Sequence, residues 1–146
     1  MSIEDDVALL ERVPTLRLLG TTALRMLAIG SEQRDFARGD VMFIADDDAD
    51  AGFIVQRGAF RIEDGGAEII AGPGALIGEL ALVVAMKRPS SATALEHSSV
   101  IRVARSLFQR VLESDPAAAR RLRDEFANRT SQIASDILIA GSKLSI

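Results

Sequence analysis

A glutamate and an arginine in a glycine-rich stretch are the two side chains best suited to bind a ligand. Glu79 directly follows Gly78, and Arg88 lies nine residues further along the chain. A carboxylate accepts hydrogen bonds from sugar hydroxyls, and the planar fork of an arginine pairs with phosphate. A ligand that carries both a ribose and a phosphate fits this pair, and a cyclic nucleotide has that chemistry.

The backbone around Gly78 is predicted to contribute to the same site. Short strands lead up to it, and the apolar run Leu80 to Leu82 suits one or two turns of helix. Glycine at such a junction lets a ligand approach the backbone closely, and the first N–H groups of a helix have no partner within it. Together with the helix dipole, these groups favour an anion. We therefore expect the amides of Gly78 to Ala81 to hold the phosphate, and the small Ala81 side chain leaves the approach open.

Two serines after the arginine are further candidates for ligand contacts. Ser90 and Ser91 follow Arg88 and Pro89. Their hydroxyls can hydrogen-bond a phosphate or a purine edge, or they can line a strand. The pattern favours the strand for Ser90 and the ligand for Ser91.

The whole stretch from Gly74 to Thr93 resembles the phosphate-binding cassette of the cyclic-nucleotide-binding domain family, whose effector domains include that of the catabolite activator protein. The residues that carry the resemblance are Arg88 and the run Gly74-x-x-x-Gly78-Glu79-Leu80-Ala81-Leu82. It implies that Glu79 binds the ribose 2′-hydroxyl and that Arg88 neutralises the cyclic phosphate. The expected ligand is cyclic AMP or cyclic GMP, with no further cofactor.

The spacing around the arginine departs from the family pattern. Members usually have Arg-Ser-Ala-Thr or Arg-Ala-Ala-Thr without a gap, whereas Pro89 and Ser90 here separate Arg88 from Ser91-Ala92-Thr93. Counted forward from Glu79, Arg88 is the phosphate arginine. Counted back from Ser91-Ala92-Thr93, that place falls to Ser90. Both registers stay open, and so does a member that keeps the fold without the ligand.

The composition excludes several other classes of site. The chain has no cysteine and one histidine, His97, so disulfides, thiolate metal sites and multi-histidine metal sites are excluded. A net charge of −4 argues against a nucleic-acid surface. The first residues are acidic, and no apolar stretch reaches membrane-spanning length. We expect a cytoplasmic protein that contacts neither membrane nor DNA directly, with no metal site and no catalytic residues.

The hydrophobic pattern predicts helices before a series of short strands. The helices are expected over Ile3–Val13, ended by Pro14, over Thr15–Gly20, and from a Thr21 or Thr22 cap to a Gly30 stop. The strands are expected at 41–44, 53–55, 60–63, 68–70, 92–95 and 100–103, with turns at Asp64-Gly65-Gly66 and Gly72-Pro73-Gly74. Regular short strands with glycine turns indicate a mainly β fold with flanking α-helices, a β-roll or double-stranded jelly-roll barrel.

Two helices are expected after the last strand. Ser106 to Gln109 reads as a capping box, and Asp115-Pro116 as the start of a longer helix. Its apolar stripe comprises Leu122, Phe126, Ile133 and Ile137, and Gly141 is expected to end it. In the family this last helix covers the nucleotide or pairs with its counterpart in a dimer. One of Arg120, Arg121 and Arg123 could supply the phosphate cation if Arg88 does not, although a solvated face is the commoner role.

All residues, 1–146, are expected to form one domain. It would comprise a helical N-terminus (1–31), a β-roll (32–104) that includes the cassette (74–93), and C-terminal helices (105–141). Few residues follow Gly141, so we expect a stand-alone sensor without a helix-turn-helix, acting through a homodimer or another protein partner. The alternative is a ligand-free dimerisation or interaction domain. A barrel enzyme is a weak third hypothesis because no pair of carboxylates stands out.

Overall fold

The computed structural model describes residues 2–125 and 127–128, which fold as a β-roll with flanking helices. Three helices come first: α1 (Ile3–Glu11), α2 (Pro14–Arg17) and α3 (Thr21–Gly30). The strands are β1 (Glu32–Phe36), β2 (Val41–Phe43), β3 (Asp48–Ala49), β4 (Ala51–Arg57), β5 (Phe60–Asp64), β6 (Ala67–Ala71), β7 (Leu76–Ile77), β8 (Met86–Lys87), β9 (Ser91–Ala94) and β10 (Ser98–Ala104). The 3₁₀ helix η1 (Glu79–Leu82) follows β7, and α4 (Arg105–Ser114) follows β10. The predicted fold class is confirmed.

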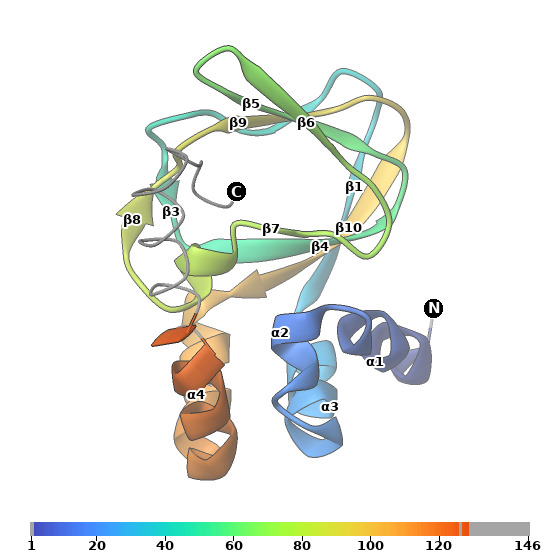
Figure 1. Ribbon diagram of the computed structural model, residues 1–146. Coiled ribbons are helices and arrows are strands. Elements are labelled where there is room, and N and C mark those ends of the chain that lie inside the picture. The colour runs from blue at the N-terminus through green and yellow to red at the C-terminus, as the bar shows by residue number, and fades with distance from the viewer. Residues whose placement is uncertain (1, 126, 129–146) are drawn as a thin grey trace.

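Two antiparallel sheets form the walls of the roll. One has the strand order β1-β10-β4-β7 and the other β2-β9-β5-β6, while β3 and β8 pair separately. Figure 1 shows the helices α1 to α3 and α4 beneath the sheet that contains β4, β7 and β10. That sheet therefore has the roll interior on one face and helices on the other.

This arrangement gives the described part of the chain two hydrophobic cores that share one sheet. Phe53 and Val55 of β4 point into the roll, where they pack with Phe60 and Ile62. Between them, Ile54 points to the other face and packs among the helices. Successive side chains on a strand alternate faces, so a strand covered on both sides is apolar throughout. This explains why residues 51–55 are all buried.

The predicted hairpin and turns are present. Gly65 and Gly66, both with positive φ, connect β5 to β6 as a two-residue loop between the paired Asp64 and Ala67. Gly74 also has positive φ, and its N–H donates to the Val55 carbonyl at 2.8 Å. The turn at Gly74 leads into β7, which is followed by η1, the predicted short helical segment.

Two predicted helix starts are wrong. The cap of α3 is Gly20, with no side-chain hydrogen bond, so Thr21 lies inside the helix instead of capping it. The predicted box at Ser106 is absent because α4 begins one residue earlier, at Arg105, where the N–H donates to the Asp50 carbonyl at 2.8 Å. In both places the start is fixed by tertiary contacts or a glycine turn, which the local pattern does not encode.

Proline near the first helices acts differently from the prediction, whereas Gly30 ends α3 as predicted. Helix α1 ends at Glu11, and Pro14 begins α2, where its fixed φ suits the first turn. Gly30 is the last residue of α3 but not a left-handed cap, because it is absent from the positive-φ residues. A Cβ at this position would lie 2.7 Å from Leu107 Cδ1, so Gly30 permits close packing of α3 on α4.

The start of the last predicted helix is as expected. Residues 116–125 are helical, and the N–H of Ala118 donates to Asp115 Oδ1 at 3.1 Å, so Asp115 acts as the N-cap. Leu122 of the predicted stripe is buried. Phe126, Ile133, Ile137 and Gly141 lie outside the described residues.

Candidate functional site

Arg88 lies inside the protein, next to the turn that begins the cassette. It is only 4% exposed, and its guanidinium carbon is 4.3 Å from the Phe43 ring centroid and 5.3 Å from that of Phe53. Its Nη2 donates to the Ala51 carbonyl at 2.9 Å. The backbone is held as well, because the Arg88 N–H donates to the Asp47 carbonyl at 2.7 Å. A buried cation over two aromatic rings is a defined electrostatic feature rather than a solvated surface charge.

The buried guanidinium has no counterion among the residues that the structure describes. Within the described residues Arg88 forms no ion pair, and its Nε has no hydrogen-bond partner. Burial lowers the pKa of Arg88, and the charges of Asp50 and Asp47 act in the opposite direction. Arginine nevertheless keeps its proton in proteins. Because burying an unpaired charge is costly, this site favours the arrival of an anion.

Gly78 brings the backbone close to this cation. It is left-handed, with φ 78°, and caps η1. A Cβ at this position would lie 2.6 Å from Arg88 Nη1, so a side chain here would compete for the same space. A cavity of about 30 Å³ lies beside the pair, lined by Gly78, Arg88, Ala49, Leu80, Ala81, Met86 and Pro89. This is room for roughly one or two water molecules, so a nucleotide requires the cassette to open.

The cassette residues do not all face this cavity. Gly78, Leu80, Ala81 and Arg88 line it, as the sequence predicts for a common site. The Ala81 N–H, however, donates to the Gly78 carbonyl at 3.1 Å. The expectation that the Ala81 N–H is free to bind a phosphate is therefore wrong for this conformation, because this N–H already forms a hydrogen bond of the 3₁₀ helix.

Glu79 is directed to the N-terminal helices. Its Oε2 accepts a hydrogen bond from Thr15 Oγ1 at 2.6 Å, and Thr15 is a buried residue of α2. Glu79 does not line the cavity beside Arg88. Glu79 and Arg88 therefore do not face a common cavity in this conformation.

The two serines are placed differently from the prediction, because Ser91 begins strand β9 and Ser90 precedes it. Ser90 is buried, and Ser91 Oγ accepts a hydrogen bond from the Ala45 N–H at 2.8 Å. Neither lines the cavity next to Gly78. The side chain that reaches Gly78 is that of Arg88, the position obtained by counting forward from Glu79.

Arg105 is a further residue of the site that the sequence analysis missed. Its Nη1 donates to the carbonyls of Ala49, Ala81 and Val84 at 2.8, 3.1 and 3.1 Å. It therefore connects the first residue of α4 to the end of η1 and to β3. No signal in the sequence indicated this role, because the capping box expected at Ser106 placed Arg105 before the helix.

Comparison with known proteins identifies the family. The sequence profile of the cyclic nucleotide-binding domain matches residues 33–115, which include the roll and α4. The chain belongs to the cyclic nucleotide-binding domain family. The predicted family is thus confirmed, and the relatives found include transcriptional regulators.

Three relatives illustrate the similarity. The HTH-type transcriptional regulator Cmr of Mycobacterium tuberculosis is 32% identical over 110 residues, which is 72% of this chain but only 45% of that regulator. A cyclic nucleotide-binding-like protein from Brucella abortus is 33% identical with a TM-score of 0.67, over 75% of this chain and 98% of that one. The N-terminal domain of a transcriptional regulator from Streptomyces coelicolor is 27% identical with a TM-score of 0.77, over 86% and 94%.

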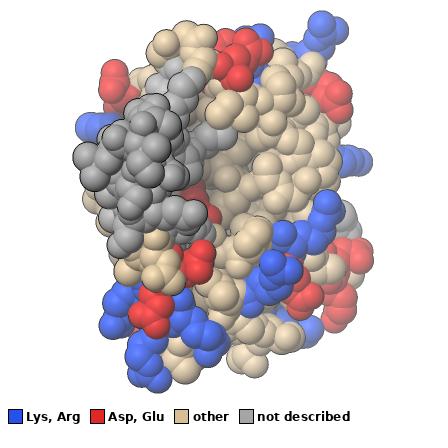
Figure 2. Space-filling view, viewed as in Figure 1, with Lys and Arg blue, Asp and Glu red and all other residues tan. Residues whose placement is uncertain are grey.

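The basic residues of the last described helix are not gathered at the cassette of this cyclic nucleotide-binding domain. Arg121 Nε donates to the Leu18 carbonyl at 2.7 Å and so ties this helix to the end of α2. Arg120 and Arg123 are exposed. Figure 2 shows basic and acidic side chains intermixed over the helical part of the visible face. No helix in the described part of the chain is long and apolar enough to cross a membrane.

Proposed function

We propose that this domain senses a cyclic nucleotide, cyclic AMP or cyclic GMP, through the cassette from Gly78 to Ser91. The observation that carries the proposal is Arg88, a buried cation with no counterion among the described residues and an unpaired Nε. A cyclic phosphate supplies the missing anion in a form that an arginine fork binds well. The family membership and the bacterial regulators among its relatives support this function.

Binding requires η1 to move. The cavity beside Arg88 is far too small for a nucleotide, so the phosphate has to displace η1 from Gly78 onward. Glu79 then exchanges its Thr15 contact for the ribose hydroxyl, or keeps both with its two oxygens. A ligand shifts this equilibrium only because it binds the open cassette better than the closed one.

The proposed output is the position of the C-terminal helices. Arg105 binds the carbonyls of Ala81 and Val84 at the end of η1 and belongs to α4. A displacement of η1 therefore pulls on the first turn of α4 directly. The C-terminal helix, acting in a homodimer or on another protein partner, would transmit the signal.

Thermal unfolding with cyclic AMP, cyclic GMP and 5′-AMP tests the ligand. A ligand that binds only the folded state adds about 2.7 kcal/mol at one hundred times its dissociation constant. We expect a raised midpoint with at least one cyclic nucleotide, and no rise in Arg88→Met. Lys87→Gln is the matched control, because Lys87 is the adjacent cation but is exposed and paired with Asp48. It should keep the full response.

Three outcomes would contradict the proposal. An unchanged midpoint with all three nucleotides, on protein shown to be free of bound nucleotide, would remove the sensor function. A rise that survives Arg88→Met would show that another cation binds the phosphate. Equal rises with 5′-AMP and the cyclic nucleotides would show that the cyclic phosphate is not what is recognised.

The second candidate function is a ligand-free interaction domain. It is favoured by the closed state of the site, in which Glu79 already binds Thr15 and Arg88 already binds the Ala51 carbonyl. In this case the cassette is a structural connection between the roll and the helices. Sedimentation analysis without nucleotide, showing a dimer whose stability does not change with cyclic nucleotide, would support it.

A further inference from the structure

A second pocket lies between α1 and the outer face of the β1-β10-β4-β7 sheet. One of its lining residues, Arg12, lies next to Gly74 at the start of the cassette, where a Cβ would be 3.3 Å from Arg12 Nη2. It has a volume of about 340 Å³, within the size range of small-molecule sites. Helix α1 contributes Asp5, Asp6, Ala8, Leu9 and Arg12, and the sheet contributes Gln33, Gln56, Arg57 and Ser99. None of these residues belongs to the cassette.

A β-bulge points two consecutive residues of β4 into this pocket. Val55 pairs with Val100 and Arg57 with Ser99, so Gln56 is an extra residue opposite a single step of β10. In a regular strand Gln56 and Arg57 would point to opposite faces. A bulge changes the direction of a side chain and is frequent next to binding sites. Here it places an amide and a guanidinium on one pocket wall, together with the cross-strand Ser99.

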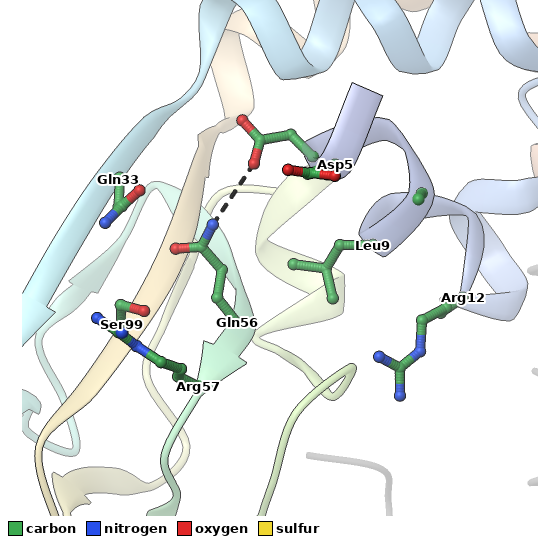
Figure 3. A pocket seen from close by; sticks show the side chains of 9 residues that line it. Asp5, Leu9, Arg12, Gln33, Gln56, Arg57 and Ser99 are labelled. Atoms are coloured by element: carbon green, nitrogen blue, oxygen red, sulfur yellow. Dashed lines mark hydrogen bonds between the residues drawn. The ribbon is translucent and has the colours of Figure 1, made fainter. Parts of the chain in front are cut away.

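Gln56 leaves a buried hydrogen-bond acceptor unused. Its Nε2 donates to Asp6 Oδ1 over a long 3.5 Å, drawn as the dashed line in Figure 3. Its Oε1 is buried and has no partner among the described residues. Leaving such an atom unsatisfied costs about 1–3 kcal/mol, which a bound N–H donor would recover. Gln56 therefore carries an unused acceptor, while the other atom of its amide, Nε2, faces the Asp6 carboxylate.

The charges of the pocket are balanced and separated. Figure 3 shows Arg12 and Arg57 on opposite sides of the pocket, with Gln56 and Leu9 between them and Asp5 near the top of the view. Within the described residues, neither aspartate forms an ion pair with either arginine. Asp5 and Arg12 are seven residues apart on one helix, which corresponds to about 10 Å along its axis. Burial also raises the pKa of Asp6, as expected for a carboxylate in a partly dry site.

We propose that this pocket binds a short zwitterion with an ammonium at one end and a carboxylate at the other, the class that includes dipeptides. The ammonium donates to Gln56 Oε1 and to the Asp6 carboxylate, and the carboxylate pairs with Arg57. Leu9 provides apolar contact for the middle of the ligand. The proposal does not rest on cyclic-nucleotide binding.

An NMR titration of the full ¹⁵N-labelled chain with the dipeptide Ala-Leu tests the proposal. We expect amide shift changes centred on Gln56, Arg57 and Ser99, including the Gln56 side-chain amide. N-acetyl-Ala-Leu, which lacks the ammonium, and Ala-Leu amide, which lacks the carboxylate, should each bind about tenfold more weakly or worse, because each loses a charge-assisted contact.

Substitutions locate the binding site. Arg57→Gln and Asp6→Asn should each weaken Ala-Leu binding about tenfold or more. Arg34→Gln is the control, because Arg34 is an exposed residue of β1 that pairs only with Glu32 among the described residues. The spectrum itself shows whether each variant is folded, and either folded variant suffices. Absence of shifts at millimolar Ala-Leu, shifts centred elsewhere, or equal binding of the blocked peptides would overturn the proposal.

Discussion

The environment of Arg88 has both favourable and unfavourable effects on the stability of the free protein. Its hydrogen bond to Ala51 and its position over Phe43 and Phe53 are favourable. Removing a cation from water costs several kcal/mol, and no counterion among the described residues offsets that cost. Such a residue is best explained by a function in binding, since an apolar side chain of similar length would serve the closed state at least as well.

Arg88→Met should therefore leave the free protein as stable as the wild type or up to about 2 kcal/mol more stable, because buried charges can often be replaced by apolar groups without loss. The measurement is the free energy of unfolding in urea without nucleotide, with Lys87→Gln as the exposed control. A loss of more than about 2 kcal/mol would instead show that the guanidinium stabilises the closed cassette. Arg88 would then be a structural residue.

Among the elements, η1 is held from both sides. Glu79 connects it to α2 through Thr15, and Arg105 connects its end to α4. A four-residue 3₁₀ helix has little stability of its own, so these contacts determine its position. The same contacts make η1 the natural place where ligand binding changes the arrangement of the helices.

Arg105→Met should lower the free energy of unfolding by about 1–3 kcal/mol, because the carbonyls of Ala49, Ala81 and Val84 lose a charged donor. Arg110→Met, at an exposed position of the same helix, controls for the loss of a charge and should change stability by less than about 0.5 kcal/mol. Chemical denaturation followed by far-UV circular dichroism measures both. Equal effects of the two substitutions would show that Arg105 does not hold η1.

Most elements could be predicted from the sequence because their signals are local. The Gly65-Gly66 hairpin, the Asp115 cap and the alternation in β5 depend on neighbouring residues alone. The role of Gly30 and the start of α4 could not be predicted from the sequence, since each depends on a contact with a distant element. At the site the sequence indicated Gly78 and Arg88, but the position of Glu79 depends on Thr15, which lies 64 residues away.

The pocket between α1 and the sheet could not be predicted from the sequence for a similar reason. It is built from α1, β1, β4 and β10, and its key feature is a bulge at Gln56 that only strand pairing reveals. Gln56 and Arg57 do not belong to any recognisable sequence motif. The role of each residue depends on the face of the sheet to which its side chain points.

At the scale of the whole molecule, β4 couples the roll to the helices. Ile54 belongs to the core under the helices, while Val55, the next residue, belongs to the core inside the roll. A strand cannot lose the packing of one face without disturbing the other, because both faces depend on the same backbone. We therefore expect the helices and the roll to unfold together, so that α1 to α3 are not an independent attachment to the sheet.

Ile54→Ala tests this coupling. Both Ile54 and Val55 are fully buried, and truncation of a buried isoleucine typically costs about 2–5 kcal/mol. If β4 joins the two cores, Ile54→Ala and Val55→Ala should each lower the midpoint of one shared transition, and the calorimetric enthalpy should equal the van't Hoff enthalpy in both variants. A first transition that is lowered only by Ile54→Ala, followed by a second that is lowered only by Val55→Ala, would show two separate units. In that case a movement of η1 could reach the helices through its own contacts, which include Arg105, Thr15 and the buried Leu82, and not through the shared strand.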